Sequence, residues 1–182
     1  MKFCETSSNI KYKWDHLCSM FYKRYPNPYS KHVLSEDVLS RHVENNILKT
    51  IRIYSKTNET PSWLQRILPT ATAYILEESH VDIETKTIVT YTKNLTLTTF
   101  LKVEEKSIFK ISNDNKDWTS VRRQSWISSS FYGLCHAFES FGAKRYISNI
   151  QRMDNGFESV LQKNNHYSTG QSTFPLPISS NM

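Results

Sequence analysis

Glycine is scarce in this chain of 182 residues, where only Gly133, Gly142, Gly156 and Gly170 occur. Neither a GxGxxG nor a GxxxxGK(S/T) phosphate-binding loop can be written with them, which excludes the common nucleotide-binding motifs. Long apolar runs are also missing, and none approaches the roughly 18 residues that a membrane-spanning helix needs. The sequence therefore predicts neither a nucleotide enzyme nor a membrane-spanning protein.

Cysteine is limited to Cys4, Cys18 and Cys135, which are far apart and form no CxxC pair. We therefore expect free thiols, and neither a disulfide framework nor a zinc site. Concentrated charge is lacking too: the net charge is +6, but no basic run exceeds two residues. A basic balance favours anionic partners, whereas nucleic-acid modules usually concentrate their charge, so we expect no nucleic-acid partner.

Strand-like segments dominate the chain. They are rich in Val, Ile, Thr and Tyr, and mostly short polar links join them, which predicts an antiparallel meander of hairpins. The expected strands are 2–10, 31–43, 47–56, 71–78, 86–93, 97–111 and 118–127.

Two helices are expected beside the strands. Trp14, Leu17 and Phe21 recur at helical spacing, and Pro26 ends that helix. Residues 128–163 read as one long helix capped by the serines at 128–130. A sheet with one short and one long helix gives an α+β domain over 1–163, and the Ser/Asn/Pro-rich residues 164–182 predict a disordered tail.

The link at 57–70 is longer than the others. It carries two prolines and an apolar group, and such loops often act as lids over a site. The apolar residues are Trp63, Leu64, Ile67 and Leu68. We expect them to close a cavity, to contact a membrane surface, or both.

Two sets of polar residues fall where core residues are expected. The apolar face of the long helix continues through Arg145, Asn149 and Arg152, and Arg52 and Lys56 share one face of the strand 47–56. In one interpretation both faces are simply solvated. In the other, both face one cavity, where buried cations persist only with an anionic partner such as a phosphate. No acidic residue is spaced along the helix face to serve as that partner.

Catalytic patterns are weak. The six histidines show no metal-ligand spacing. The pairs Glu77-Glu78 and Glu104-Glu105 are adjacent on expected strands, so the members of each pair face opposite ways and form no acid–base couple. We expect no enzymatic activity.

One segment is far more specific than these patterns. The run KRYPNPYSKHVL at 23–34 closely resembles the signature of the PRELI domain family of mitochondrial lipid-transfer proteins. Further matches are KTN at 56–58, PSW at 61–63, KVEE at 102–105, DWT at 117–119 and SSSF at 128–131. The resemblance covers essentially residues 1–163, and YSKH at 29–32 resembles the phosphatidic-acid branch of the family.

The resemblance implies a fold and a function. The fold is a curved seven-stranded antiparallel sheet that encloses a lipid cavity, like START and phosphatidylinositol-transfer proteins. The function is carriage of phosphatidic acid between the outer and inner mitochondrial membranes, in support of cardiolipin synthesis. The resemblance also implies the intermembrane space, a heterodimer with a small twin-CX9C chaperone, transient contact with anionic membranes, and a phospholipid ligand without any cofactor.

Site residues can be carried over one by one. The headgroup-binding positions of the family match Arg24, His32, Lys56, Arg145, Asn149 and Arg152, and Arg52 joins them from the strand pattern. Aromatic residues are expected to wall the cavity, namely Trp63, Tyr74, Tyr91, Phe131, Phe138 and Phe141. Two alternatives remain open: a phosphatidylserine carrier of the same fold, and an interaction or scaffold protein with a filled core.

Overall fold

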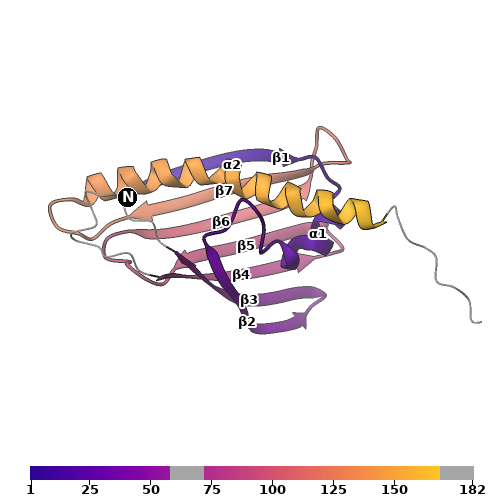
Figure 1. Ribbon diagram of the computed structural model, residues 1–182, viewed down its shortest axis with the longest axis horizontal. Coiled ribbons are helices and arrows are strands. Elements are labelled where there is room, and N and C mark those ends of the chain that lie inside the picture. The colour runs from indigo at the N-terminus through magenta and orange to yellow at the C-terminus, as the bar shows by residue number, and fades with distance from the viewer. Residues whose placement is uncertain (58–71, 169–182) are drawn as a thin grey trace, which may run out of the picture.

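The computed structural model describes residues 1–57 and 72–168, which form one antiparallel sheet with helices on one face (Figure 1). The strands are β1 (Lys2–Ile10), β2 (Val33–Glu44), β3 (Ile47–Thr57), β4 (Thr72–Asp82), β5 (Thr87–Asn94), β6 (Lys102–Ile111) and β7 (Thr119–Ser128). The helices are α1 (Trp14–Met20), the short 3-10 turn η1 (Phe21–Lys23) and α2 (Cys135–Ser168).

The sheet has the order β1-β7-β6-β5-β4-β3-β2, and every neighbouring pair is antiparallel. Strands β2 to β7 therefore form a continuous meander, while β1 pairs with β7 at one edge. The connection from β1 to β2 crosses the sheet through α1 and η1. The expected α+β architecture with seven antiparallel strands is confirmed.

Two apolar clusters hold the helices to the sheet. Around α1, Trp14, Leu17 and Phe21 pack with the C-terminal half of α2, which contributes Phe157 and Leu161. Near the start of α2, Phe138 packs against Leu97, Phe100, Leu101 and Phe131. Phe138 lies near the start of α2, and Phe157 and Leu161 lie in its second half, so the two clusters attach the helix to the sheet at two separate places.

Close approach of α2 to the sheet depends on Gly142. A Cβ at this position would lie 2.7 Å from Leu101 Cδ1 and 2.9 Å from Ile127 Cγ2. Real Cβ contacts are essentially never that short, so a larger residue would push the helix away from the sheet. Glycine therefore sets the distance between the helix and the sheet at this end.

Some expected boundaries were wrong. The short helix was predicted to run on to Pro26, but α1 ends at Met20 and η1 follows. Strand β6 begins at Lys102 and not at 97, because Leu97 adopts a φ of 59° and its carbonyl accepts hydrogen bonds from the Phe100 and Leu101 amides. The Asn94 side chain holds this turn through hydrogen bonds with the Leu101 carbonyl and the Val103 amide.

The long helix also differs from its predicted limits. Helix α2 begins at Cys135, because Ser128 ends β7 and Gly133 turns the chain with a φ of 78°. The Ser129 hydroxyl accepts a hydrogen bond from the Phe131 amide, so it shapes the turn and does not cap the helix. The helix continues to Ser168, beyond the predicted end at Lys163. Within the described residues, α2 and the other helices are not long and apolar enough to cross a membrane.

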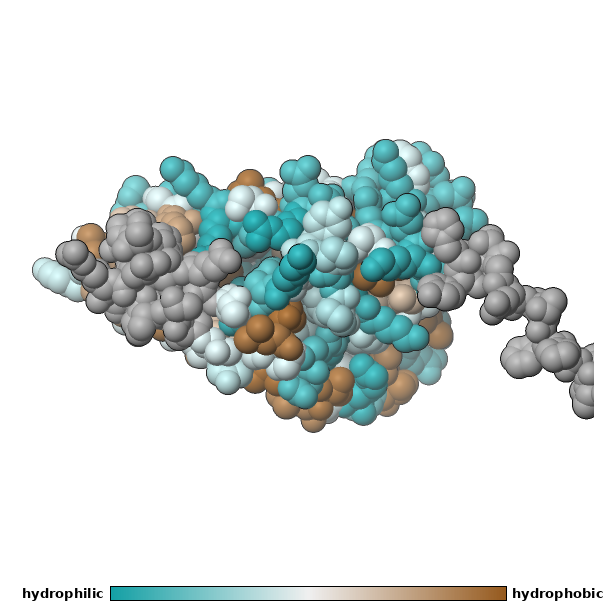
Figure 2. All heavy atoms as spheres, viewed as in Figure 1, coloured by the Kyte–Doolittle hydropathy of each residue, from teal (hydrophilic) through white to brown (hydrophobic). Residues whose placement is uncertain are grey.

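Apolar side chains also reach the surface. Figure 2 shows them gathered at the lower edge of the molecule, where Figure 1 places β2 and β3. The exposed apolar residues on β2 are Leu34, Val38, Leu39 and Val43. Because β2 is an edge strand, this edge combines unpaired backbone groups with exposed apolar side chains.

Candidate functional site

A cavity of about 330 Å³ lies between the inner face of the sheet and α2. Phe21 and Phe157 border it at one end, and Phe100 and Phe138 at the other. Its volume falls within the range of ligand-binding pockets, about 300–1,000 Å³. The enclosed space is thus bounded by the same two apolar clusters that attach the helices.

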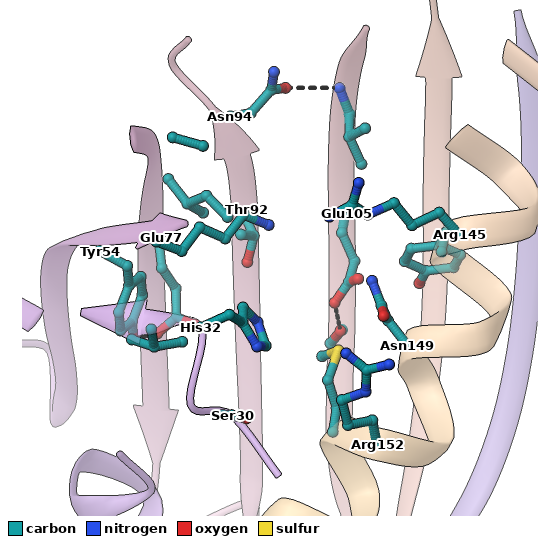
Figure 3. A pocket seen from close by; sticks show the side chains of 18 of the residues that line it. Ser30, His32, Tyr54, Glu77, Thr92, Asn94, Glu105, Arg145, Asn149 and Arg152 are labelled. Carbon is teal, nitrogen blue, oxygen red and sulfur yellow. Dashed lines mark hydrogen bonds between the residues drawn. The ribbon is translucent and has the colours of Figure 1, made fainter. Parts of the chain in front are cut away.

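Polar side chains from several elements converge on the middle of this cavity (Figure 3). Arg24 follows η1, His32 precedes β2, and Lys56 lies near the end of β3. Helix α2 contributes Arg145, Asn149 and Arg152 from the opposite wall. Every headgroup position that the family resemblance implied therefore lines one cavity, so the interpretation in which both faces are simply solvated is wrong.

Local periodicity explains why they converge. Thr50, Arg52 and Tyr54 are buried, so the face of β3 that carries them and Lys56 points inward. On α2, Arg145 and Asn149 are half-buried, while Arg152 is exposed at the rim of the cavity. The two polar sets therefore meet because a strand repeats every two residues and a helix every 3.6.

Lys56 has an unfavourable environment for a cation. It makes no hydrogen bond or ion pair with the described part of the chain. Burial, followed by the charge of Arg145, lowers the pKa of the Lys56 ammonium from 10.5 to about 8. Two cationic side chains thus repel each other across a cavity, which makes the cavity attractive to an anion.

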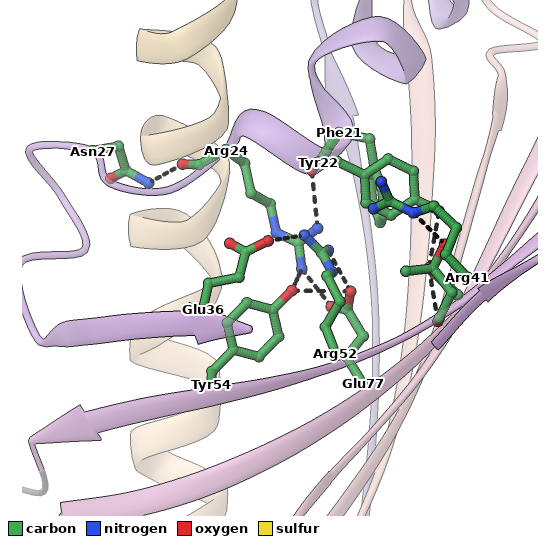
Figure 4. Close-up of polar contacts among 11 residues, drawn as sticks. Phe21, Tyr22, Arg24, Asn27, Glu36, Arg41, Arg52, Tyr54 and Glu77 are labelled. Atoms are coloured by element: carbon green, nitrogen blue, oxygen red, sulfur yellow. Dashed lines mark hydrogen bonds and ion pairs between the residues drawn. The ribbon is translucent and has the colours of Figure 1, made fainter. Parts of the chain in front are cut away.

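Arg24 differs from Lys56 because it already has an anionic partner (Figure 4). Its guanidinium pairs with the Glu77 carboxylate and donates hydrogen bonds to Tyr54 Oη at 2.9 Å and to the Phe21 carbonyl at 3.1 Å. Burial would raise the pKa of Glu77, but the charges of Arg24 and Arg52 outweigh it and hold that pKa below its usual value. Glu77 serves Arg24 from β4, so it was missed when an acidic partner was sought along the helix face.

Arg52 belongs to the same network and does not line the cavity. Its side chain is fully buried and pairs with Glu36 and Glu77. The guanidinium also lies 4.8 Å from the Tyr22 ring centroid and 5.2 Å from that of Tyr54. Because Glu36 and Glu77 are protein side chains, Arg52 supports the wall of the cavity, and the structure does not bring it to the lining with the other expected headgroup residues.

The expected aromatic wall is only partly present. Phe138 and Phe141 line the cavity. Tyr74 and Tyr91 are 43% exposed on the outer face, and Phe131 packs behind Phe138. The predicted lid residues Trp63, Leu64, Ile67 and Leu68 lie outside the described residues.

Three acidic side chains in the cavity were missed as site residues. Glu77 lies on β4, Glu105 on β6 and Asp154 on α2. Asp154 pairs with the buried Arg123 of β7, so this charge is balanced as that of Glu77 is. The alternation within each Glu-Glu pair already placed one member of each on the inner face, but the sequence did not indicate which one. No group of three metal-ligating side chains occurs among the residues that the structure describes.

Comparison with known sequences gives a consistent result. The model of the PRELI-like family matches residues 15–167. PRELI domain-containing protein 1, mitochondrial, of Homo sapiens is 39% identical over 167 residues, which cover 90% of this chain and 76% of that protein. Protein UPS1, mitochondrial, of Saccharomyces cerevisiae is 33% identical over 145 residues, which cover 79% of this chain and 83% of that protein.

Solved structures show the fold alone. TTHA0849 from Thermus thermophilus matches with a TM-score of 0.62 at 12% identity, covering 90% of this chain and 99% of that one. Ara h 8.0201 matches with a TM-score of 0.56 at 12% identity and the same coverage. These likenesses confirm the expected START-like arrangement of a sheet around a long C-terminal helix.

Proposed function

The chain belongs to the PRELI-like family, and from this membership we propose that it is a non-enzymatic lipid-transfer protein that carries phosphatidic acid. It moves this lipid between the outer and inner mitochondrial membranes, in the intermembrane space, and so feeds cardiolipin synthesis. The observation that carries the proposal is the cationic centre of the cavity, where Lys56, Arg145 and Arg152 face a space bounded by apolar clusters.

Carriage requires an apolar enclosure because of the lipid chains. Exposing each CH₂ group to water costs about 0.8 kcal/mol, so two long acyl chains cost on the order of 20 kcal/mol or more. Phe100, Phe138 and Phe157 supply apolar surface at the two ends of the cavity. Transfer through water becomes possible only because the protein replaces the membrane around the chains.

The headgroup chemistry matches the polar centre. The phosphate of phosphatidic acid is a monoester, and such groups carry a charge of about −1.5 to −2 at pH 7. Lys56 would gain the anionic partner that it lacks among the described residues, and Asn149 offers an amide donor. A headgroup that carries its own ammonium would bring a cation among cations, which favours phosphatidic acid over phosphatidylserine.

Two kinds of partner complete the proposal. We propose a heterodimer with a small twin-CX9C chaperone, for which the apolar edge at β2 offers an available surface. The net charge of +6 favours transient contact with anionic membranes. Co-expression with such a chaperone should shift the protein to the elution volume of a one-to-one complex, and separate elution would contradict it.

A vesicle assay tests the proposal. Donor vesicles carry labelled phosphatidic acid or labelled phosphatidylserine, and transfer to acceptor vesicles is followed over time. Lys56→Glu and Arg152→Glu, singly and together, should reduce phosphatidic acid transfer at least tenfold. Lys144→Glu is the matched control, because Lys144 is an exposed residue of α2 outside the cavity. If phosphatidic acid moves no faster with the protein than without it, the proposal is wrong. If phosphatidylserine moves faster than phosphatidic acid, the protein is a phosphatidylserine carrier.

A further inference from the structure

Among the cavity residues that the structure describes, Glu105 is the acidic one without an ion pair. It lies on the inner face of β6 with Val103 and Ser107, and its Oε1 accepts a hydrogen bond of 2.5 Å from Ser107 Oγ. Glu77 pairs with two arginines and Asp154 with Arg123. Within residues 1–57 and 72–164, Glu105 has no ion pair.

A buried hydroxyl lies beside this carboxylate. Tyr146 of α2 lines the cavity and is only 9% exposed, and its Oη makes no hydrogen bond of normal geometry with the described residues. Burial, followed by the nearby charge of Glu105, raises the pKa of the Tyr146 phenol. The phenol therefore stays protonated at neutral pH, so an acceptor and a donor stand together on the cavity wall.

The Glu105 carboxylate is unfavourable for an anionic ligand in the cavity, because like charges repel. Glu105 lines the same cavity as Arg145, Asn149 and Arg152, the side chains proposed to hold phosphate, and Figure 3 shows it on β6 opposite the helix that carries them. A carboxylate close to a phosphate repels it unless a proton lies between the two groups. A phosphate monoester can hold that proton near neutral pH, because its second pKa is about 6 and its singly and doubly charged forms are in exchange there. The single P–OH group of a phosphate diester is far more acidic and is already ionised at pH 7, so a diester has no proton to supply.

We propose that Glu105 accepts a hydrogen bond from the P–OH group of a monoprotonated phosphate monoester, and so selects monoester over diester phospholipids. The inference rests on the proposed function, and it names the residue that sets the substrate class. The cationic side chains attract any phosphate, whereas Glu105 rejects phosphates that cannot donate a proton to it. Specificity thus arises because the Glu105 carboxylate repels anionic lipids whose phosphate cannot donate a proton to it.

The test compares two lipids that differ by one methyl group. Phosphatidic acid and phosphatidylmethanol with the same acyl chains compete for the full-length protein at pH 7, and bound lipid is extracted and quantified. Wild type should prefer phosphatidic acid by tenfold or more, since a hydrogen bond to a charged group contributes about 1.5–3 kcal/mol. Glu105→Gln should bring this preference to within about threefold.

The control is Glu104→Gln. Glu104 is the neighbouring residue on the outer face of β6, where it pairs with Lys102 at 3.0 Å and is 45% exposed. It should keep the wild-type preference. Equal binding of both lipids by wild type, a comparison that needs no variant, would overturn the inference while leaving lipid carriage intact.

Three other outcomes are also decisive. If Glu105→Gln keeps the full preference, the carboxylate does not select the monoester. If phosphatidylserine is added to the competition, wild type prefers it and Glu105→Gln abolishes that preference, then the carboxylate binds an ammonium group and the inference is wrong. If wild type binds none of these lipids, the proposed function fails first.

Discussion

Lys56→Met should stabilise the empty protein, although it removes a proposed ligand-binding group. Burial and then the Arg145 charge lower the Lys56 pKa from 10.5 to about 8. One pKa unit corresponds to about 1.4 kcal/mol, so the charged ammonium costs the folded state on the order of 3 kcal/mol at pH 7. Methionine keeps the unbranched stem and removes the charge, so the free energy of unfolding should rise by up to that amount.

The effect should depend on pH in a defined direction. The folded protein binds the Lys56 proton less tightly than the unfolded chain does, so the stability of wild type rises as pH increases from about 8 to 10.5. Urea denaturation should therefore show the largest advantage of Lys56→Met at pH 7 and almost none above pH 10.5. Lys110→Met, at an exposed position of β6, should show no such dependence.

Ligand binding should make wild type more stable than Lys56→Met. Phosphatidic acid places an anion beside Lys56, so it should stabilise wild type more than Lys56→Met in the same denaturation experiment. The reasoning is refuted if Lys56→Met is no more stable than wild type at pH 7. It is also refuted if the stability difference between the two proteins does not change with pH.

Further changes probe the walls of the cavity. Glu77→Gln should lower the free energy of unfolding by about 3–5 kcal/mol, because it leaves two buried arginines without their shared carboxylate. The control Glu78→Gln, on the exposed face, should change the free energy of unfolding little. Equal effects of the two substitutions would contradict the role of Glu77 as the shared partner of the arginines. Because the Glu77 pKa is held below its usual value, its contribution should be lost as acid protonates it, so Glu77→Gln should show a flatter loss of stability below about pH 4 than wild type. Gly142→Val should cost about 1–3 kcal/mol by forcing α2 away from Leu101, and an unchanged melting temperature would show that the contact adjusts freely.

The sequence predicted which strand and helix carry the site residues better than it predicted the ion pairs that these residues form. The alternation along β3 correctly put Lys56 on the same face as Arg52, and the helical repeat along α2 put Arg145 on the same face as Asn149, because both periods are local properties of the chain. Whether these faces are solvated or point into a cavity depends on packing, and the sequence left that open. The pairing of Arg52 with Glu77 was missed. These residues are directly opposite each other on β3 and β4, and the long segment 58–71 between the two strands hides their register in the sequence.

The start of α2 shows a second limit. Residues 128–134 carry good helix-capping residues, yet Ser128 ends β7 and the following turn is held by tertiary contacts, such as the hydrogen bond from the Ser130 amide to the Thr99 carbonyl. Local propensity cannot register such a contact between distant segments. The balance of charges in the cavity escaped prediction for the same reason, since Glu105 and Asp154 acquire their roles only through the packing of α2 on the sheet.

Mass spectrometry of the lipid that co-purifies with the protein addresses the central claim most directly. The account predicts one phosphatidic acid molecule per protein in wild type, and little or none in Lys56→Glu prepared in the same way. The account is contradicted if purified wild type contains no lipid. It is also contradicted if wild type and Lys56→Glu contain equal amounts of a zwitterionic phospholipid.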